Sequence, residues 1–209
     1  MISRSRAIFV LFINLRFSTI LKSNISAENV KLGVEKQKSL RLKKHFSEFY
    51  RIVRKSKSNA PIILFSAGVG NVIVEKLKQD GFDLNDMVII SNFFDYESKR
   101  LLNESSNITM FTKNSDYIPK DNLSANVKLF IVIGDHDQDF TMMKSKSLPN
   151  ETSQKIFSIG LINQKDFNDK TLLKAKIETF TQNFDAFVVN DEDFGVFTKI
   201  CKNLEPAYS

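Results

Sequence analysis

Three short polar clusters hold the residues of this chain that are best suited to chemistry. The first is the turn at Ser66 and Ala67, which offers a hydroxyl and neighbouring backbone N–H groups. The second is Lys113, and the third is a carboxylate cluster that runs from Asp135 to Asp139. The turn and the ammonium suit an anionic oxygen, whereas the carboxylates suit a hard divalent cation, Mg²⁺ above others. A phosphate monoester that bridges the lysine and a magnesium ion would use all three clusters.

Each cluster by itself has a simpler structural explanation. A Ser-Ala-Gly sequence after a strand is most often a turn, and a single lysine is usually solvated. Asp135 and Asp139 at the start of a helix would be favourable charges near the positive end of the helix dipole. A shared site is favoured by their order, because each cluster follows an apolar run typical of a strand. Ligands of open α/β sheets bind at the carboxyl ends of the strands.

The elements that must position these clusters alternate along the chain. Helical periodicity is found over 71–79, 172–180 and 194–204, with Cys201 expected in the core. Strands that alternate with helices predict a parallel sheet covered on both faces, and therefore an α/β fold. The apolar runs that predict the strands cover residues 61–65, 87–90, 108–111, 128–133, 156–159 and 186–189.

A further helix is predicted before the first of these strands. Between residues 36 and 58, apolar side chains recur with helical spacing from Leu42 to Val53, and basic residues occupy the other face. His45 lies next to the apolar stripe, and we interpret it as a packing or surface residue.

Composition excludes several classes of function. The chain has 209 residues, of which 42% are hydrophobic and 26% charged, which is enough for one domain with a core. One cysteine and two histidines exclude a disulfide framework, a cysteine-based zinc cluster and a site built on several histidines. Residues 1–60 hold 14 Lys and Arg against 3 acids, a local net charge of +11, and the remainder holds 16 against 21, a net of −5. No nucleic-acid-binding motif accompanies this charge, so no nucleic-acid partner is expected.

The basic N-terminal region allows three interpretations. Residues 1–27 hold four basic residues and no acid, and their apolar run from Ala7 to Leu15 is too short to span a bilayer as a helix. The region is a targeting leader of the mitochondrial kind, an element of the fold, or a poorly specified tail. We expect residues 1–35 to form a divergent basic leader or substitute strand, and 36–209 to form the core. The expected location is cytoplasmic, with the mitochondrion as the alternative, and the sequence does not fix the oligomeric state.

The stretches that carry these clusters resemble the cytosolic pyrimidine 5′-nucleotidases of the haloacid dehalogenase superfamily. Residues 61–72 (PIILFSAGVGNV) look like the strand, turn and helix of that family, and residues 88–96 (VIISNFFDY) resemble its next distinctive stretch. Three shorter matches, 111–113 (FTK), 133–135 (IGD) and 158–163 (SIGLIN), follow in the family's order and approximate spacing. The resemblance covers about residues 60–205 and implies a Rossmann-like parallel sheet of the haloacid dehalogenase type.

The resemblance also assigns roles to the residues that match the family's motifs. Ser66 and Ala67 would contact the substrate phosphate, and Lys113 would neutralise its charge. Asp135 would ligate Mg²⁺, and Asp139 would support that site. The implied reaction is Mg²⁺-dependent dephosphorylation of pyrimidine nucleoside 5′-monophosphates through an aspartyl phosphate.

Two features of the family are not visible in the sequence. The family's catalysis starts from an Asp-x-Asp pair after the first strand, but no aspartate precedes Asp80 here, so the catalytic residues are unknown. The helical cap between that pair and the Ser-Ala-Gly turn is not visible either. We therefore expect an incomplete fold that lacks its first strand and cap, unless Ala7–Leu15 substitutes for that strand.

These departures leave alternatives open. Asp135 and Asp137 form an Asp-x-Asp pair of their own, but few residues follow it, so the magnesium role is favoured. His136 and Gln138 replace small residues of the family's motif. The alternative to a nucleotidase is a catalytically inactive nucleotide-binding or interaction remnant that lacks the nucleophilic aspartate.

Overall fold

The computed structural model describes most of the chain, in twelve stretches. The stretches are 6–12, 26–38, 40–55, 61–102, 108–109, 112, 117–119, 127–136, 139, 155–163, 167–189 and 193–208. Besides the strands and α-helices given next, the described residues include one turn of 3-10 helix, Leu84–Asp86. The strands and helices follow in the order β1 (Arg6–Phe12), α1 (Ala27–Lys36), α2 (Phe46–Lys55), β2 (Ile62–Val69), α3 (Gly70–Gln79), β3 (Met87–Asn92), β4 (Phe94–Asp95), β5 (Arg100–Leu101), β6 (Val127–Gly134), β7 (Lys155–Ile162), α4 (Lys170–Asn183), β8 (Ala186–Val189) and α5 (Gly195–Tyr208).

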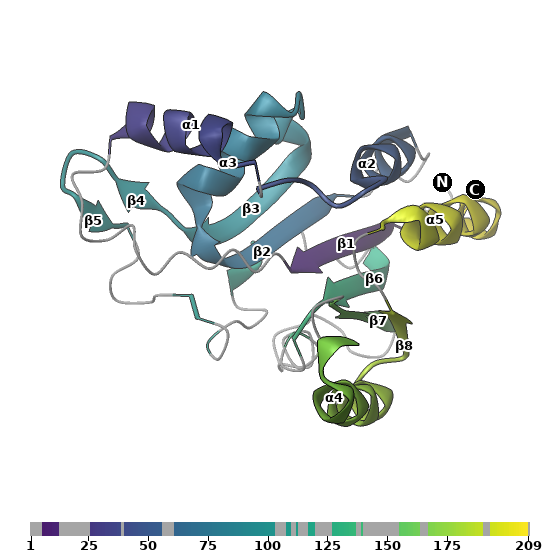
Figure 1. Cartoon of the computed structure of the whole chain (residues 1–209). Coiled ribbons are helices and arrows are strands. Elements are labelled where there is room, and N and C mark those ends of the chain that lie inside the picture. The colour runs from purple at the N-terminus through teal and green to yellow at the C-terminus, as the bar shows by residue number, and fades with distance from the viewer. Residues whose placement is uncertain are drawn as a thin grey trace.

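A six-stranded parallel sheet with the order β3-β2-β1-β6-β7-β8 forms the centre of the fold (Figure 1). Residues 62–65 of β2 and 130–133 of β6 are continuous apolar runs, and their side chains are at most 1% exposed. Such runs are typical of strands that are covered on both faces. The predicted α/β fold of the haloacid dehalogenase type is therefore confirmed in its class, and Cys201 lies in the core as expected.

The N-terminal strand corrects the expectation that the first strand is missing. β1 lies in the middle of the sheet and pairs in parallel with β2 on one side and β6 on the other. Of the three interpretations of the N-terminal region, the structure supports the one in which this region contributes an element of the fold. α1 also belongs to the fold rather than to a separate leader, because Val30 and Val34 pack against Val72 of α3.

The helix that was expected between residues 36 and 58 forms only from Phe46 to Lys55, as α2, and a separate helix that was not expected, α1, precedes it. α1 begins after Ser26, whose Oγ accepts the backbone N–H of Asn29 at 3.1 Å, and it ends at Lys36. α2 begins only at Phe46, because His45 has a left-handed backbone with φ of 59° and cannot continue a helix. Both helices pack onto the sheet domain, α1 on α3 and α2 on α5, so the described residues between β1 and β2 hold no separate helical cap.

The strand expected at residues 108–111 is also wrong where the structure describes it. Ile108 and Thr109 are not in a strand, and residues 110 and 111 lie outside the described residues. The buried backbone of Ile108 bonds the side chain of Asn92 in place of a neighbouring strand. Over the part of the chain that is described, none of the helices has the length and apolar character needed to cross a membrane.

Candidate functional site

The sheet brings two of the predicted clusters to one edge. Leu64 of β2, Leu11 of β1 and Ile133 of β6 form one row across three neighbouring strands. Ser66 and Asp135 each lie two residues beyond that row, so they stand level at the carboxyl edge. Neighbouring strands are about 4.8 Å apart, which puts the two backbones about 10 Å from each other.

The Ser66 turn, residues 66–68, lies in the second half of β2, where the pairing of β2 with β3 is irregular, shortly before β2 passes into α3. Ser66 is fully buried, and its Oγ accepts the N–H of Gly68 at 3.0 Å. α3 starts at Gly70, and no side chain caps its first turn. A helix N-terminus that follows a tight turn favours a bound anion, because its N–H groups and dipole point outward. The phosphate-binding role of Ser66 and Ala67 stays a prediction.

Two residues of β3 hold the carbonyl groups of this turn. Ser91 Oγ donates to Gly68 O at 2.9 Å, and Asn92 Nδ2 donates to Ala67 O at 3.0 Å. Ser91 and Asn92 belong to the stretch 88–96 that resembles the family, and the resemblance assigns neither of them a role. The signal that was available is a pair of small polar residues at the end of an apolar strand, beside the carboxyl end of the next strand.

The carboxylate cluster follows β6. Asp139 is 2% exposed, and its Oδ2 accepts the N–H of His136 at 3.1 Å, while its own N–H donates to His136 O at 3.0 Å. Asp135 is half-buried, and its Oδ2 accepts Asn163 Nδ2 at 3.4 Å. Two carboxylates at a partly buried strand end fit Mg²⁺, which takes a few carboxylate oxygens and completes its shell with water.

Larger metal clusters are not found where the structure is described, since no three His, Cys, Asp or Glu side chains there gather closely enough to hold an ion. Lys113 and Asp137 lie outside the described residues, and the role given to Lys113 stays a prediction. The segment before Lys113 is described in part: Thr109 and Thr112 each accept the other's backbone N–H through their hydroxyls, at 3.1 and 2.8 Å.

The catalytic residues stay unknown. The family's nucleophile would follow the first strand, and β1 ends at Phe12. Residues 13–25, which lie outside the described residues, contain neither aspartate nor glutamate.

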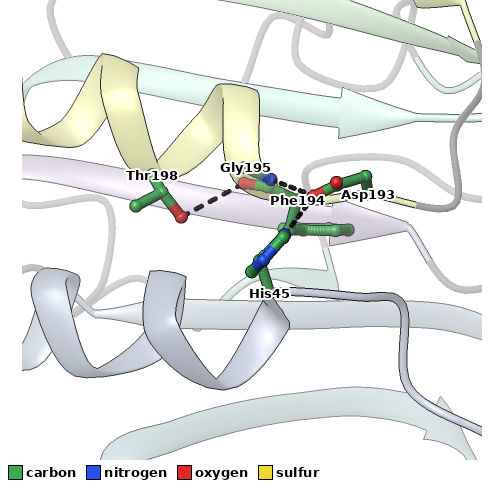
Figure 2. Close-up of polar contacts among 5 residues, drawn as sticks. All are labelled: His45, Asp193, Phe194, Gly195 and Thr198. Atoms are coloured by element: carbon green, nitrogen blue, oxygen red, sulfur yellow. Dashed lines mark hydrogen bonds and ion pairs between the residues drawn. The ribbon is translucent and has the colours of Figure 1, made fainter.

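A second polar cluster ties the starts of two helices together (Figure 2). His45 Nδ1 lies 2.6 Å from Asp193 Oδ1, which also accepts the N–H of Gly195, the first residue of α5, at 2.6 Å. The hydrogen bond from His45 holds the pKa of the Asp193 carboxyl below its usual value. The two side chains are 41% and 45% exposed. We interpret this hydrogen-bonded pair as a clip, meaning a side-chain link between the starts of α2 and α5. It could not be recognised in the sequence, because 148 residues separate His45 from Asp193.

A central parallel sheet with helices packed on it, and with polar residues near the carboxyl ends of β2 and β6, is an α/β fold of the haloacid dehalogenase type. Within that class, the chain belongs to the pyrimidine 5′-nucleotidase (UMPH-1) family, whose sequence model matches residues 15–205.

Several known proteins are similar to this chain. The 7-methylguanosine phosphate-specific 5′-nucleotidase B of Xenopus laevis is 27% identical over 148 residues, which cover 67% of this chain and 46% of the frog protein. The corresponding nucleotidase of Gallus gallus is 26% identical over 177 residues, covering 82% and 56%. The crystal structure of cytosolic 5′-nucleotidase IIIB bound to cytidine superposes with a TM-score of 0.64 at 20% identity, covering 87% of this chain and 57% of that one. The chain spans about half the length of these relatives.

Proposed function

We propose that this chain binds the phosphate of nucleoside 5′-monophosphates together with Mg²⁺ at the carboxyl edge of its sheet, and that it hydrolyses the phosphomonoester. The observation that carries the proposal is the register of the central strands, which sets Ser66 and Asp135 level on either side of β1. Membership of a 5′-nucleotidase family supports the same chemistry.

Each side of the proposed site contributes a different interaction. The hydroxyl of Ser66 would bind a phosphate oxygen, and the Gly68 N–H, which donates to Ser66 Oγ at 3.0 Å, would hold that hydroxyl in place. The carbonyl groups of the turn are held by bonds to β3. Asp135 and Asp139 would hold Mg²⁺, which when bound polarises a phosphoryl oxygen and offsets its charge. Asn163 restrains the Asp135 carboxylate and so orients it. The ammonium of Lys113 would complete the set by neutralising the phosphate.

The substrate range is proposed from the relatives. The family is named for pyrimidine nucleotides, two relatives are named for 7-methylguanosine phosphate, and the similar crystal structure holds cytidine. CMP, UMP and 7-methyl-GMP are therefore the substrates to compare.

Nucleotide binding without turnover is the alternative that the sequence left open. One experiment separates the two: phosphate release from each nucleotide by the pure chain with Mg²⁺, measured beside the thermal midpoint. Release above buffer identifies the hydrolase. A raised midpoint without release identifies the binding protein, and neither response would refute both.

We also propose that the protein acts in the cytoplasm, with its N-terminus retained. A targeting leader that was cleaved near residue 30 would remove β1, which bonds strands on both of its sides. A fluorescent fusion of residues 1–30 should therefore stay diffuse, and accumulation in mitochondria would contradict this location.

A further inference from the structure

The side chain of Asn92 connects two segments that are distant in sequence. Asn92 is the last residue of β3 and is 8% exposed. Its Nδ2 donates to Ala67 O at 3.0 Å and to Ile108 O at 2.8 Å, and its Oδ1 accepts the N–H of Ile108 at 2.9 Å. Both polar atoms of this amide are engaged, and all three bonds go to backbone groups.

On one side, these bonds fix the turn that begins at Ser66. A peptide unit is planar, so fixing the Ala67 carbonyl also fixes the direction of the next N–H, that of Gly68. Ser91 holds the following carbonyl at 2.9 Å, and Ser66 Oγ accepts the Gly68 N–H at 3.0 Å. The orientation of the turn's N–H groups therefore depends on side chains of β3.

On the other side, the amide of Asn92 makes the same backbone hydrogen bonds to Ile108 that a neighbouring strand would make. It satisfies both backbone groups of a residue that is 2% exposed. The paired hydroxyls of Thr109 and Thr112 then close a turn that ends one residue before Lys113. The amide thus sets the distance between the Ser66 turn and the backbone of Ile108.

We propose that Asn92 is a positioning residue of the phosphate site: it holds the Ser66 turn and the backbone of Ile108 in fixed relation and does not touch the phosphate itself. The phosphate half of this inference rests on the proposed function, whereas the positioning half stands on the contacts alone.

The chain offers a matched control in Asn71. Its Oδ1 accepts the N–H of Phe94 at 2.7 Å and its Nδ2 donates to Phe94 O at 3.1 Å, so it makes the same paired bonds to a different segment. Asn71→Ala should therefore remove a comparable interaction without loosening the Ser66 turn.

The test compares Asn92→Ala and Asn71→Ala in the full chain with Mg²⁺, at a temperature where both are folded. Binding of inorganic phosphate and backbone amide hydrogen exchange are the two measurements. Asn92→Ala should weaken phosphate binding about tenfold, equal to about 1.4 kcal/mol, and should speed exchange at Ile108 and Gly68. Asn71→Ala should speed exchange at Phe94 and leave phosphate affinity unchanged. If Asn92→Ala does not fold, Asn92→Asp keeps the acceptor for the Ile108 N–H but loses the donor to Ala67 O and to Ile108 O. It should weaken phosphate binding while the Ile108 N–H stays protected from exchange.

The outcomes distinguish the inference from the proposed function. Equal phosphate affinities in the two alanine variants would overturn the positioning role, as would unchanged exchange at Gly68 in Asn92→Ala. A wild-type chain that binds no phosphate would refute the proposed function instead. The positioning role would then be decided by exchange alone, with faster exchange at Ile108 and Gly68 in Asn92→Ala supporting it.

Discussion

Gly134→Ala should weaken both the fold and its response to Mg²⁺. Gly134 is the last residue of β6, and a Cβ there would lie 2.4 Å from Asp139 Cβ and 2.6 Å from its Oδ2, where ordinary contacts are 3.4–4 Å. Asp139 must therefore move by about 1 Å, since Cβ atoms do not approach that closely. The move would break the bond from His136 N–H to Asp139 Oδ2.

The magnitude follows from these two losses. Overpacking a tight interior costs about 1–3 kcal/mol, and a hydrogen bond to a charged group contributes about 1.5–3 kcal/mol. We expect a loss of about 3 kcal/mol, because partial relaxation reduces the sum. For a chain of this size that corresponds to a thermal midpoint lower by roughly 10 °C. The displaced carboxylate should also lose its share of any metal site.

Gly160→Ala is the matched control. Gly160 is the register partner of Gly134 on β7, and its Cβ would lie 2.5 Å from the Phe180 ring rather than from a carboxylate. It should lower the thermal midpoint by a similar amount but leave the shift on adding Mg²⁺ intact. Gly33→Ala, in an open position of α1, should raise stability by about 0.5–1 kcal/mol.

The assay is the thermal midpoint of each variant with and without Mg²⁺. Loss of the Mg²⁺ shift in Gly134→Ala alone supports a metal site at Asp139. The reasoning is refuted if Gly134→Ala keeps the full shift, or if Gly160→Ala loses it as well.

Three further predictions address the other parts of the structure. Ser66→Ala removes the acceptor for Gly68 N–H and should cost about 1 kcal/mol and weaken phosphate binding, measured by calorimetry; unchanged affinity would exclude a role for the turn. Val10→Pro removes an N–H from the central strand and should cost at least about 1–3 kcal/mol in denaturant unfolding, whereas Ala27→Pro, at the first position of α1, should be tolerated. The pKa of Asp193 is lowered from 3.8, so its stabilising effect is present above that pH and is lost as the pH falls through the folded value. Asp193→Asn should therefore flatten the acid limb of the stability profile, and an unchanged slope would argue against the clip with His45.

The sheet was largely predictable from the sequence, for a physical reason. Residues 62–65 and 130–133 are buried, and a strand that is covered on both faces needs an uninterrupted run of apolar residues, which can be recognised in the sequence. β1 is visible in the sequence as an apolar run, but its place in the sheet depends on pairing with strands about 55 and 120 residues away. α1 escaped notice because only Val30 and Val34 of its ten residues are buried.

The candidate site was predictable only in part. Ser66 and Asp135 follow strong strands, so their places at one edge follow from the topology rule for parallel sheets. The bonds from Asn92 were not predictable, since they join a side-chain amide to backbone groups 25 and 16 residues away and leave no periodic trace. The break before α2 was hidden for a similar reason, because the left-handed conformation of His45 goes with its long-range bond to Asp193.

The effect of Mg²⁺ on the affinity for CMP tests most directly whether phosphate and cation share one site. If one phosphate group is held between the Ser66 turn and a cation on Asp135, then CMP should bind about tenfold more tightly with Mg²⁺ than with a chelator, as calorimetry would measure. Asp135→Asn should remove that difference while the chain stays folded. Equal CMP affinity with and without Mg²⁺ in the wild-type chain, or a metal effect that persists in Asp135→Asn, would contradict the shared site.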